Sequence, residues 1–240
     1  MSTVCIVQAR MGSTRLPGKS VMSLARKPMI WHILNRLKQA ETIDYVVLAI
    51  PKEIDNDTLI ESALSLGLVT FEVKGDPNDL LGRYAKAAIR TDADTIVRVP
   101  GDNPCIDPDE VDRIVEIYEK NARQVHCLIT NLDQNVLGNG YPGGLGAEVY
   151  DPRFLFWLDR NIDDTRQREH PHLWAFENKR VMTCACPQEF RRPDLRFDVN
   201  TISDFEFIAD IYNHFKDHIF DSKELIDYID TKDDQHRSMN

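Results

Sequence analysis

A loop near the start of the chain combines tight turns, hydroxyl groups and positive charge. The apolar run Val4 to Val7 predicts a short buried strand, and residues 8 to 19 then leave it as a loop. Two glycines allow turns that point backbone N–H groups inward; the loop also holds two hydroxyls and three cations, namely Ser13, Thr14, Arg10, Arg15 and Lys19. This combination predicts a cradle for phosphate groups. The charges alone leave a solvated basic loop as the alternative.

Oxygen donors follow two further predicted strands. The strand predicted over 94–99 runs into Pro-Gly-Asp-Asn-Pro, so Asp102 lies beyond the carboxyl end of a parallel strand, where open α/β sheets bind ligands. Near the end of the chain, Leu195, Phe197 and Val199 alternate as the inward face of a strand. That strand would carry Arg196, Asp198 and Asn200 together on its other face, which gives two oxygen donors side by side.

The loop also resembles a known signature. Gln-Ala-Arg-Met-Gly-Ser-Thr-Arg-Leu-Pro-Gly-Lys, residues 8–19, is similar at twelve consecutive positions to the N-terminal motif of cytidylyltransferases that activate acidic sugars. The branch of spore coat polysaccharide biosynthesis protein F is the most similar, and the CMP-sialate and CMP-Kdo synthetases are more distant. The loop is not a Walker A motif, because Gly-x-x-x-x-Gly-Lys-Ser/Thr is absent. The resemblance implies that the loop binds a nucleoside triphosphate through Ala9, Arg10, Met11, Gly12, Ser13, Arg15 and Lys19.

Three later segments extend the resemblance. Residues 75–84 are similar to Gly-x-x-x-Asp-Val-Leu-x-Arg-Tyr, a segment that lies near the nucleotide base in the family. The resemblance implies that Arg83 faces the nucleotide. The alternative is that Arg83 is a surface arginine on an amphipathic helix. Residues 138–148 resemble Tyr-Pro-x-Gly-Leu-x-x-Glu, which borders the acceptor pocket and implies substrate contacts at Tyr141 and Glu148. Glu148 would touch a substrate hydroxyl or pair with a basic residue of the cradle.

The segment 168–172 resembles Arg-Glu-His-Val-Thr-Pro of the family and implies a structural or substrate-lining role for Arg168 and His170. A metal site built on its two histidines is weak, because no third ligand stands at a suitable spacing.

A magnesium site is also implied by the resemblance. Gly-Asp-x-Pro around Asp102 is similar to the family motif whose aspartate coordinates Mg²⁺ on the triphosphate; an Asx turn is the alternative. Family synthetases usually end their last strand with Asp-Thr-x-x-Asp, and Asn200 stands where their metal-binding aspartate does. Asp198 matches a second carboxylate of the sialate enzymes. We therefore expect Mg²⁺ to be held by Asp102 and by Asp198 or Asn200.

The elements that must position these residues alternate between strand and helix. Strands are predicted at 45–50, 69–73, 94–99 and 126–130, and helices at 28–40, 55–66, 76–89, 107–120, after Asp151 and from Asp204. This order predicts a single α/β domain over 1–240 with a doubly wound, mostly parallel sheet and a frayed tail at 231–240.

Composition limits the partners. With 42% hydrophobic residues in 240, the chain can form one large core, and its net charge of −10 argues against nucleic-acid binding. An anionic nucleotide would then need a local positive patch and a divalent cation. No apolar run approaches the roughly 18 residues of a membrane span, and three residues before the first strand leave no room for a signal peptide, so we expect a cytoplasmic protein. Five cysteines, an odd number, are expected to be reduced.

Together these features predict transfer of CMP from CTP to an acidic sugar or another small anionic or phosphorylated acceptor, with release of pyrophosphate, in cell-surface polysaccharide synthesis. Arg15, Lys19 and Asp102 are the expected catalytic residues, and the resemblance implies a homodimer. Two alternatives remain: a glycosyltransferase that uses a nucleotide sugar, and a non-catalytic nucleotide-binding module.

Overall fold

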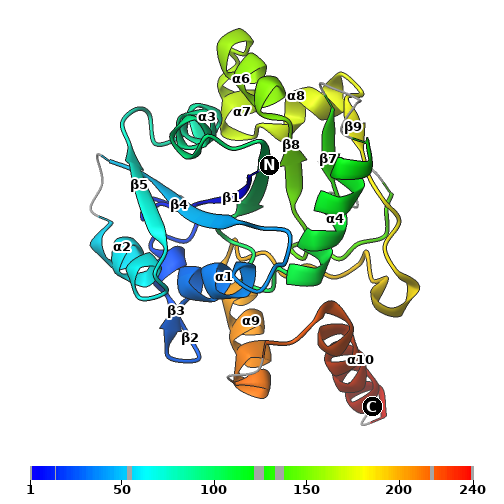
Figure 1. The fold of residues 1–240 in the computed structure, drawn as a ribbon. Coiled ribbons are helices and arrows are strands. Elements are labelled where there is room, and N and C mark those ends of the chain that lie inside the picture. Colours follow the sequence, from blue (N-terminus) through cyan, green and yellow to red (C-terminus); the bar gives the residue numbers. More distant parts are fainter. Residues whose placement is uncertain are drawn as a thin grey trace.

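A computed structural model describes residues 2–13, 15–52, 56–121, 127–132, 138–216 and 219–238. Its centre is a seven-stranded sheet with the order β5-β4-β1-β6-β8-β7-β9 (Figure 1). The strands are β1 (Thr3–Gln8), β4 (Tyr45–Pro51), β5 (Val69–Val73), β6 (Thr95–Pro100), β7 (Leu128–Thr130), β8 (Glu148–Tyr150) and β9 (Val181–Met182).

The sheet is mostly parallel. β1 pairs in parallel with β4 on one side and β6 on the other, and β5 pairs in parallel with β4. β8 runs antiparallel to both β6 and β7, whereas β9 is parallel to β7. The prediction of a mostly parallel, doubly wound sheet is confirmed.

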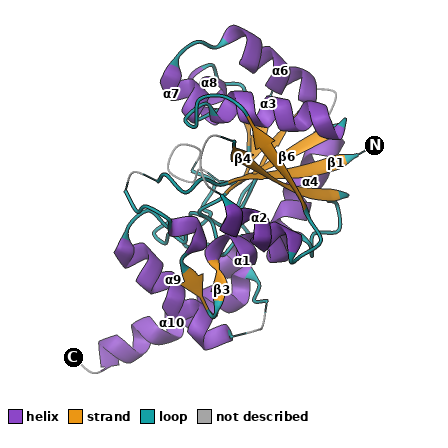
Figure 2. Ribbon diagram, turned by 90° about the vertical axis from the view of Figure 1, so that its left-hand side faces the viewer, coloured by secondary structure: helices purple, strands orange, loops and turns teal. Residues whose placement is uncertain are grey.

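Helices cover both faces of the sheet (Figures 1 and 2). They are α1 (Met29–Leu37), α2 (Asp57–Leu64), α3 (Leu80–Thr91), α4 (Pro108–Asn121), α6 (Pro152–Asn161), α7 (Thr165–Glu169) and α8 (His172–Glu177). One core packs α1, α2 and α4 against Cys5 and Val7 of β1; the other packs α3, α6 and α8 against Val4 and Ile6. Alternate residues of β1 thus enter opposite cores, as the two-residue repeat of a strand requires.

A third core lies beside the sheet and holds one side of the candidate site. It combines α9 (Ile202–Phe215), α10 (Ser222–Ser238), the hairpin of β2 (Ser23–Leu24) and β3 (Lys27–Pro28), and the segment before α9. The short helices η1 (Lys19–Val21) and η2 (Gln188–Phe190) flank it. Phe197 and Val199 are fully buried in this core. Their burial fixes the backbone that carries Asp198 between them.

Several predicted boundaries differ from the structure. α3 begins at Leu80, because Asp79 and not the Asp-Pro pair at 76–77 caps it, accepting the Gly82 amide at 3.0 Å. Asp107 starts α4 as predicted, but the carboxylate of Glu110 accepts the Tyr141 hydroxyl at 2.5 Å and does not complete a capping box. α10 continues to Ser238, where a frayed tail was expected.

The strand predicted around 195–199 is extended chain without a ladder. A single bridge joins Arg196 to Gly143, and the Phe197 amide donates to the Gly143 carbonyl at 2.8 Å. The predicted alternation of buried and outward side chains is nevertheless present. Predictions at Thr14, Asp55 and His126 lie outside the described residues. Among the described residues, no helix is both long and apolar enough to cross a membrane.

Candidate active site

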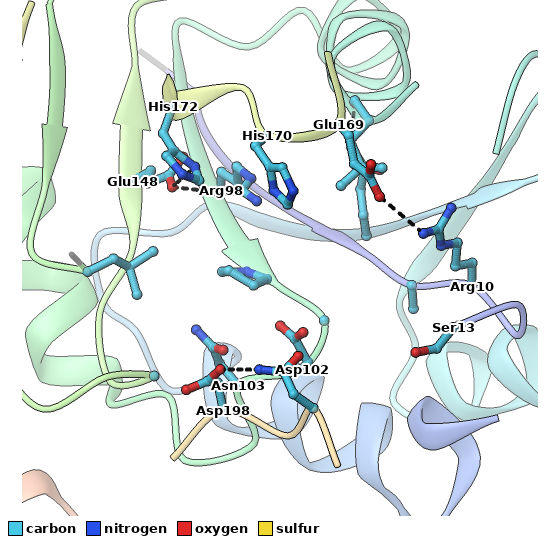
Figure 3. A pocket seen from close by; sticks show the side chains of 18 of the residues that line it. Arg10, Ser13, Arg98, Asp102, Asn103, Glu148, Glu169, His170, His172 and Asp198 are labelled. Atoms are coloured by element: carbon cyan, nitrogen blue, oxygen red, sulfur yellow. Dashed lines mark hydrogen bonds and ion pairs between the residues drawn. The ribbon is translucent and has the colours of Figure 1, made fainter. Parts of the chain in front are cut away.

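A cavity of about 650 Å³ opens at the carboxyl ends of β1 and β6. Its lining comes from the loops after these two strands, from α3, and from the segments 143–148, 169–176 and 196–200. Figure 3 shows side chains from these distant segments facing one another across it. Gly101 lets the two loops meet, because a Cβ at this position would lie 2.1 Å from the carbonyl oxygen of Gln8. The cavity is therefore where an open α/β sheet binds ligands.

Two cations of the cradle reach across the cavity to the opposite segments. Lys19 Nζ donates to Asp102 Oδ2 at 2.8 Å and to the Val199 carbonyl at 2.6 Å. Arg15 Nη2 donates to Asn200 Oδ1 at 2.6 Å. Both cations therefore already have protein oxygen partners, but an ammonium has three donors and a guanidinium five, so these bonds do not use all of them.

Arg10 is the third cation of the cradle in the lining. Its Nη1 donates to the Pro77 carbonyl at 3.0 Å, and its Nη2 lies 3.5 Å from Glu169 Oε1. The side chains or backbone of Ala9 and Ser13 complete this part of the lining. Arg10 thus connects the cradle to the start of α3 and to the end of α7.

Asp102 and Asp198 lie together on the wall opposite Arg98 and Glu148 (Figure 3). The Val199 amide donates to the Asp102 carbonyl at 2.8 Å and so joins their two segments. Asp198 Oδ2 accepts Arg196 Nη2 at 2.8 Å and Asn200 Nδ2 at 2.5 Å. Asp102, Arg196, Asp198 and Asn200 thus line one cavity.

This carboxylate pair fits a magnesium ion. Mg²⁺ is usually bound by one or two carboxylates, with substrate phosphates and water supplying its other oxygens. Among the described residues, no group of three His, Cys, Asp or Glu side chains forms a closed metal site. The amide of Asn200 accepts Arg15 at its oxygen and donates from its nitrogen to Asp198, so it also orients that carboxylate. Asp102, together with Asp198 or Asn200, would hold the ion.

Arg83 is neither a surface residue nor fully free for a ligand. It is buried, with Nη1 donating to Gln8 Oε1 at 2.7 Å and Nη2 to the Pro77 carbonyl at 2.7 Å. Gln8 in turn donates to the Leu80 carbonyl at 2.8 Å. Arg83, Gln8 and Leu80 all line the cavity, which places them beside the cradle as a rigid floor. The surface alternative for Arg83 is wrong.

The second wall of the cavity, here called the histidine wall, consists of Arg98, Glu148, Glu169, His170 and His172. Arg98 Nη1 lies 2.5 Å from Glu148 Oε1, and His172 Nδ1 lies 3.3 Å from the same oxygen. Burial would raise the pKa of Glu148, but the charges of Arg98 and His172 and hydrogen bonds outweigh it and lower the pKa to about 2. Glu148 therefore pairs with a basic residue of β6, not with one of the cradle.

The lining is locally positive despite the acidic chain. Among its described residues, Arg and Lys number six and Asp and Glu four, an excess of two cations, whereas the whole chain carries −10. Burial, followed by the charge of His172, lowers the pKa of His170, so this histidine adds little charge at neutral pH. The local positive patch that an anionic nucleotide needs is present.

Four predicted contacts lie outside the lining. Tyr141 is fully buried and bonds to Glu110, and Arg168 is bonded to Asp79 and Asp159, so both have structural partners. Met11 packs on the first core, and Gly12 is exposed. Sequence analysis assigned no lining role to Gln8, Arg98 or Asn103, which the structure places in the lining. A cation inside the apolar strand TIVRVP was the available signal for Arg98.

The cavity thus combines the cationic loop that follows β1 with two carboxylates, that of Asp102 after β6 and that of Asp198 in the segment before α9. A sequence model of cytidylyltransferases matches residues 4–229. The chain belongs to the cytidylyltransferase family.

Relatives of this family cover most of the chain. The chain is 30% identical to the uncharacterised protein MJ1063 of Methanocaldococcus jannaschii, over 100% of the chain and 95% of that protein. It is 28% identical to the spore coat polysaccharide biosynthesis protein SpsF of Bacillus subtilis, over 86% and 85%. A 3-deoxy-manno-octulosonate cytidylyltransferase of Trichlorobacter lovleyi is 32% identical over 59% of the chain and 60% of its own length.

Solved structures agree with the fold. A cytidylyltransferase from Leptospira borgpetersenii superposes with a TM-score of 0.88 at 28% identity, covering 98% of the chain and 96% of that structure. A CMP-2-keto-3-deoxy-manno-octonic acid synthetase complexed with CTP superposes with a TM-score of 0.68 over 89% of the chain and 99% of its own. At 18% identity, the second likeness shows the fold alone.

Proposed function

We propose that this protein transfers the cytidylyl group of CTP to an acidic sugar, with release of pyrophosphate, and that it depends on Mg²⁺. The observation that best supports this is the meeting of three cradle cations and two carboxylates in one cavity. Relatives named for polysaccharide biosynthesis and for octulosonate activation favour a sugar acid as the acceptor and cell-surface polysaccharide as its destination.

The cradle binds and orients the triphosphate in this proposal. Arg15 and Lys19 exchange their partners Asn200 and Asp102 for the outer phosphates, and backbone N–H groups of the loop add further donors. A bound Mg²⁺ would neutralise phosphate charge at Asp102 and Asp198. Transfer of this kind needs positioning and charge compensation, and no protein nucleophile.

The acceptor binds beside the histidine wall in this proposal. CTP fills the half of the cavity near the cradle, and the remaining lining residues surround the other half. The acceptor hydroxyl then attacks the α-phosphorus, the new P–O bond forms, and the bond to the β-phosphate oxygen breaks to release pyrophosphate. The hydroxyl proton leaves to water or to a carboxylate of the site.

A coupled pyrophosphate assay tests the proposal. Purified protein with Mg²⁺ is given CTP, UTP, ATP or GTP together with a panel of sugar acids: 3-deoxy-manno-octulosonate, sialate, legionaminate and pseudaminate. We expect release of pyrophosphate with CTP and at least one acid, and loss of this release with EDTA. A parallel reaction contains a nucleotide sugar in place of the triphosphate. Its turnover without pyrophosphate would instead indicate a glycosyltransferase, and absence of all turnover would favour a binding module.

A further inference from the structure

His172 begins α8, and its ring lies between a buried carboxylate and the cavity (Figure 3). Nδ1 is buried and lies 3.3 Å from Glu148 Oε1. The side chain is 22% exposed and lines the cavity. Because Nδ1 faces Glu148, Nε2 is the polar ring atom that remains for a ligand.

Glu148 determines which nitrogen of His172 carries the proton. The carboxylate accepts Arg98 Nη1 at 2.5 Å and the Tyr150 hydroxyl at 2.7 Å, and these two donors keep it ionised. An ionised carboxylate only accepts hydrogen bonds, so the nitrogen that faces it bears the proton. In a neutral imidazole the other nitrogen is then an acceptor with a free lone pair.

Arg98, the arginine of the histidine wall, is paired. Glu148 compensates the charge of Arg98, whose side chain is 8% exposed. The ring of His170 lies 6.0 Å from that of His172, centroid to centroid, and Phe176 lies 5.2 Å away. With its proton on Nδ1, His172 offers a hydrogen-bond acceptor at Nε2 within an otherwise cation-rich lining.

We propose that Nε2 of His172 accepts a hydrogen bond from a hydroxyl group of the acceptor sugar, and that Glu148 is the positioning residue that keeps this ring protonated at Nδ1. The proposal rests on the proposed function, since it assigns this wall to the acceptor. The same geometry determines which part of the acceptor can lie at Nε2. A carboxylate or phosphate placed at Nε2 would meet a lone pair, so the anionic part of the acceptor lies elsewhere in the cavity.

Nuclear magnetic resonance tests the protonation without any substrate. Long-range ¹H–¹⁵N correlation spectra are recorded on the ligand-free protein at about pH 8, where histidine is neutral. The signals of His172 are identified by their loss in His172→Asn. We expect a protonated Nδ1 and an unprotonated Nε2. A ring protonated at Nε2 overturns the proposal, whether or not the protein proves to transfer cytidylyl groups.

Two substitutions separate the roles of the ring nitrogens. In His172→Asn the amide nitrogen stands near Nδ1 and the Nε2 position is lost, whereas in His172→Gln the amide reaches the Nε2 position. With the sugar acid of the panel that reacts fastest, we expect His172→Asn to raise the KM for the acid about tenfold, the effect of one hydrogen bond, and His172→Gln to raise it less. The KM for CTP stays unchanged in both.

Equal losses in the two variants, or a matching rise in the KM for CTP, overturn the assignment. If no acid of the panel reacts, the proposed function fails, and the protonation measurement alone decides the proposal for His172.

Discussion

Lys19 illustrates how single residues of the cavity exchange partners. Its ammonium group is bonded to Asp102 and to the Val199 carbonyl, and in the proposed function a phosphate takes over the first of these contacts. We expect Lys19→Ala to weaken Mg²⁺-CTP binding about 10- to 100-fold, since a charge-assisted bond contributes about 1.5–3 kcal/mol. CMP, which lacks the outer phosphates, should lose little. Calorimetric titration measures both.

The matched control for Lys19 is Lys27→Ala. Lys27 is an exposed lysine of the β2–β3 hairpin that stacks on Trp31 away from the cavity, and its removal should leave both affinities unchanged. Equal losses for CTP and CMP in Lys19→Ala would show that the loop binds the nucleotide in another orientation.

The carboxylate pair gives a second prediction at the same scale. We expect Asp102→Asn and Asp198→Asn each to lower kcat by about a hundredfold or more, because each removes negative charge where Mg²⁺ is expected to bind. Asn200→Asp should keep Mg²⁺-dependent activity, since it restores the carboxylate usual in the family. An active Asp198→Asn beside an inactive Asn200→Ala would place the metal at position 200. Circular dichroism confirms that each variant folds.

Glu148 links the histidine wall to stability. Glu148→Gln leaves Arg98 buried without a charged partner, and we expect it to lower the free energy of unfolding by about 3–5 kcal/mol at pH 7. Urea denaturation measures this loss. The exposed pair of Glu116 and Lys120 provides the control, since Glu116→Gln should change it by less than about 1 kcal/mol.

The pH dependence of this loss follows from the pKa of Glu148. In the folded protein it is about 2, below the ordinary value of 4.5, so the charged form stabilises the fold. That stabilisation is complete above the unfolded value and disappears as the pH falls through the folded value. The difference between wild type and Glu148→Gln should therefore shrink between about pH 5 and 2. A difference that stays constant over this range would show that the Glu148 charge is not the cause.

At the scale of elements, Arg168 joins three helices. It bonds to both carboxylate oxygens of Asp79, which caps α3, to the Asp159 side chain of α6 at 2.7 Å, and to the Ile162 carbonyl at 2.8 Å. We expect Arg168→Ala to lower the free energy of unfolding by about 2 kcal/mol or more, while the KM of the folded enzyme stays unchanged. Thermal denaturation and initial rates measure the two effects.

Arg166→Ala is the control for this prediction. Arg166 lies two residues away on the same helix and pairs with Glu177 at the surface, so its loss should cost less than about 1 kcal/mol. A stable Arg168→Ala with a raised KM for the sugar acid would instead support the substrate contact that the family resemblance implied.

Sequence analysis predicted elements better than their pairing. β5 has the predicted bounds, because a short run of β-branched and aromatic residues between turns identifies a strand locally. Around Phe197 the predicted alternation of buried and outward side chains was correct. The backbone of this segment, however, pairs with the loop at Gly143, and such pairing depends on residues far away in the chain. Arg98 was missed for the same reason, since its partner Glu148 lies fifty residues later. Local motifs identify Asp102, Lys19, Glu148 and His170, whereas the pairing of Arg98 with Glu148 becomes visible only in the folded structure.

For the whole molecule, the arrangement of layers explains why one cavity collects so many distant residues. Two cores fix the parallel strands β1 and β6 side by side, so the loops that follow them meet at one edge. The third core then holds the segment of Asp198 against the same edge. A chain with a net charge of −10 thereby offers an anionic nucleotide a lining with an excess of two cations.

The central claim is that the α-phosphorus of CTP moves to the sugar acid in this cavity. Phosphorus-31 magnetic resonance of the wild-type reaction, with Mg²⁺ and the reacting acid, follows every phosphorus atom at once. We predict that CTP signals disappear while pyrophosphate and one new phosphodiester appear in equimolar amounts, with signal areas of two to one, and that Asp102→Asn shows neither. Conversion of CTP to CDP and inorganic phosphate, or to CMP without a new phosphodiester, would contradict the account.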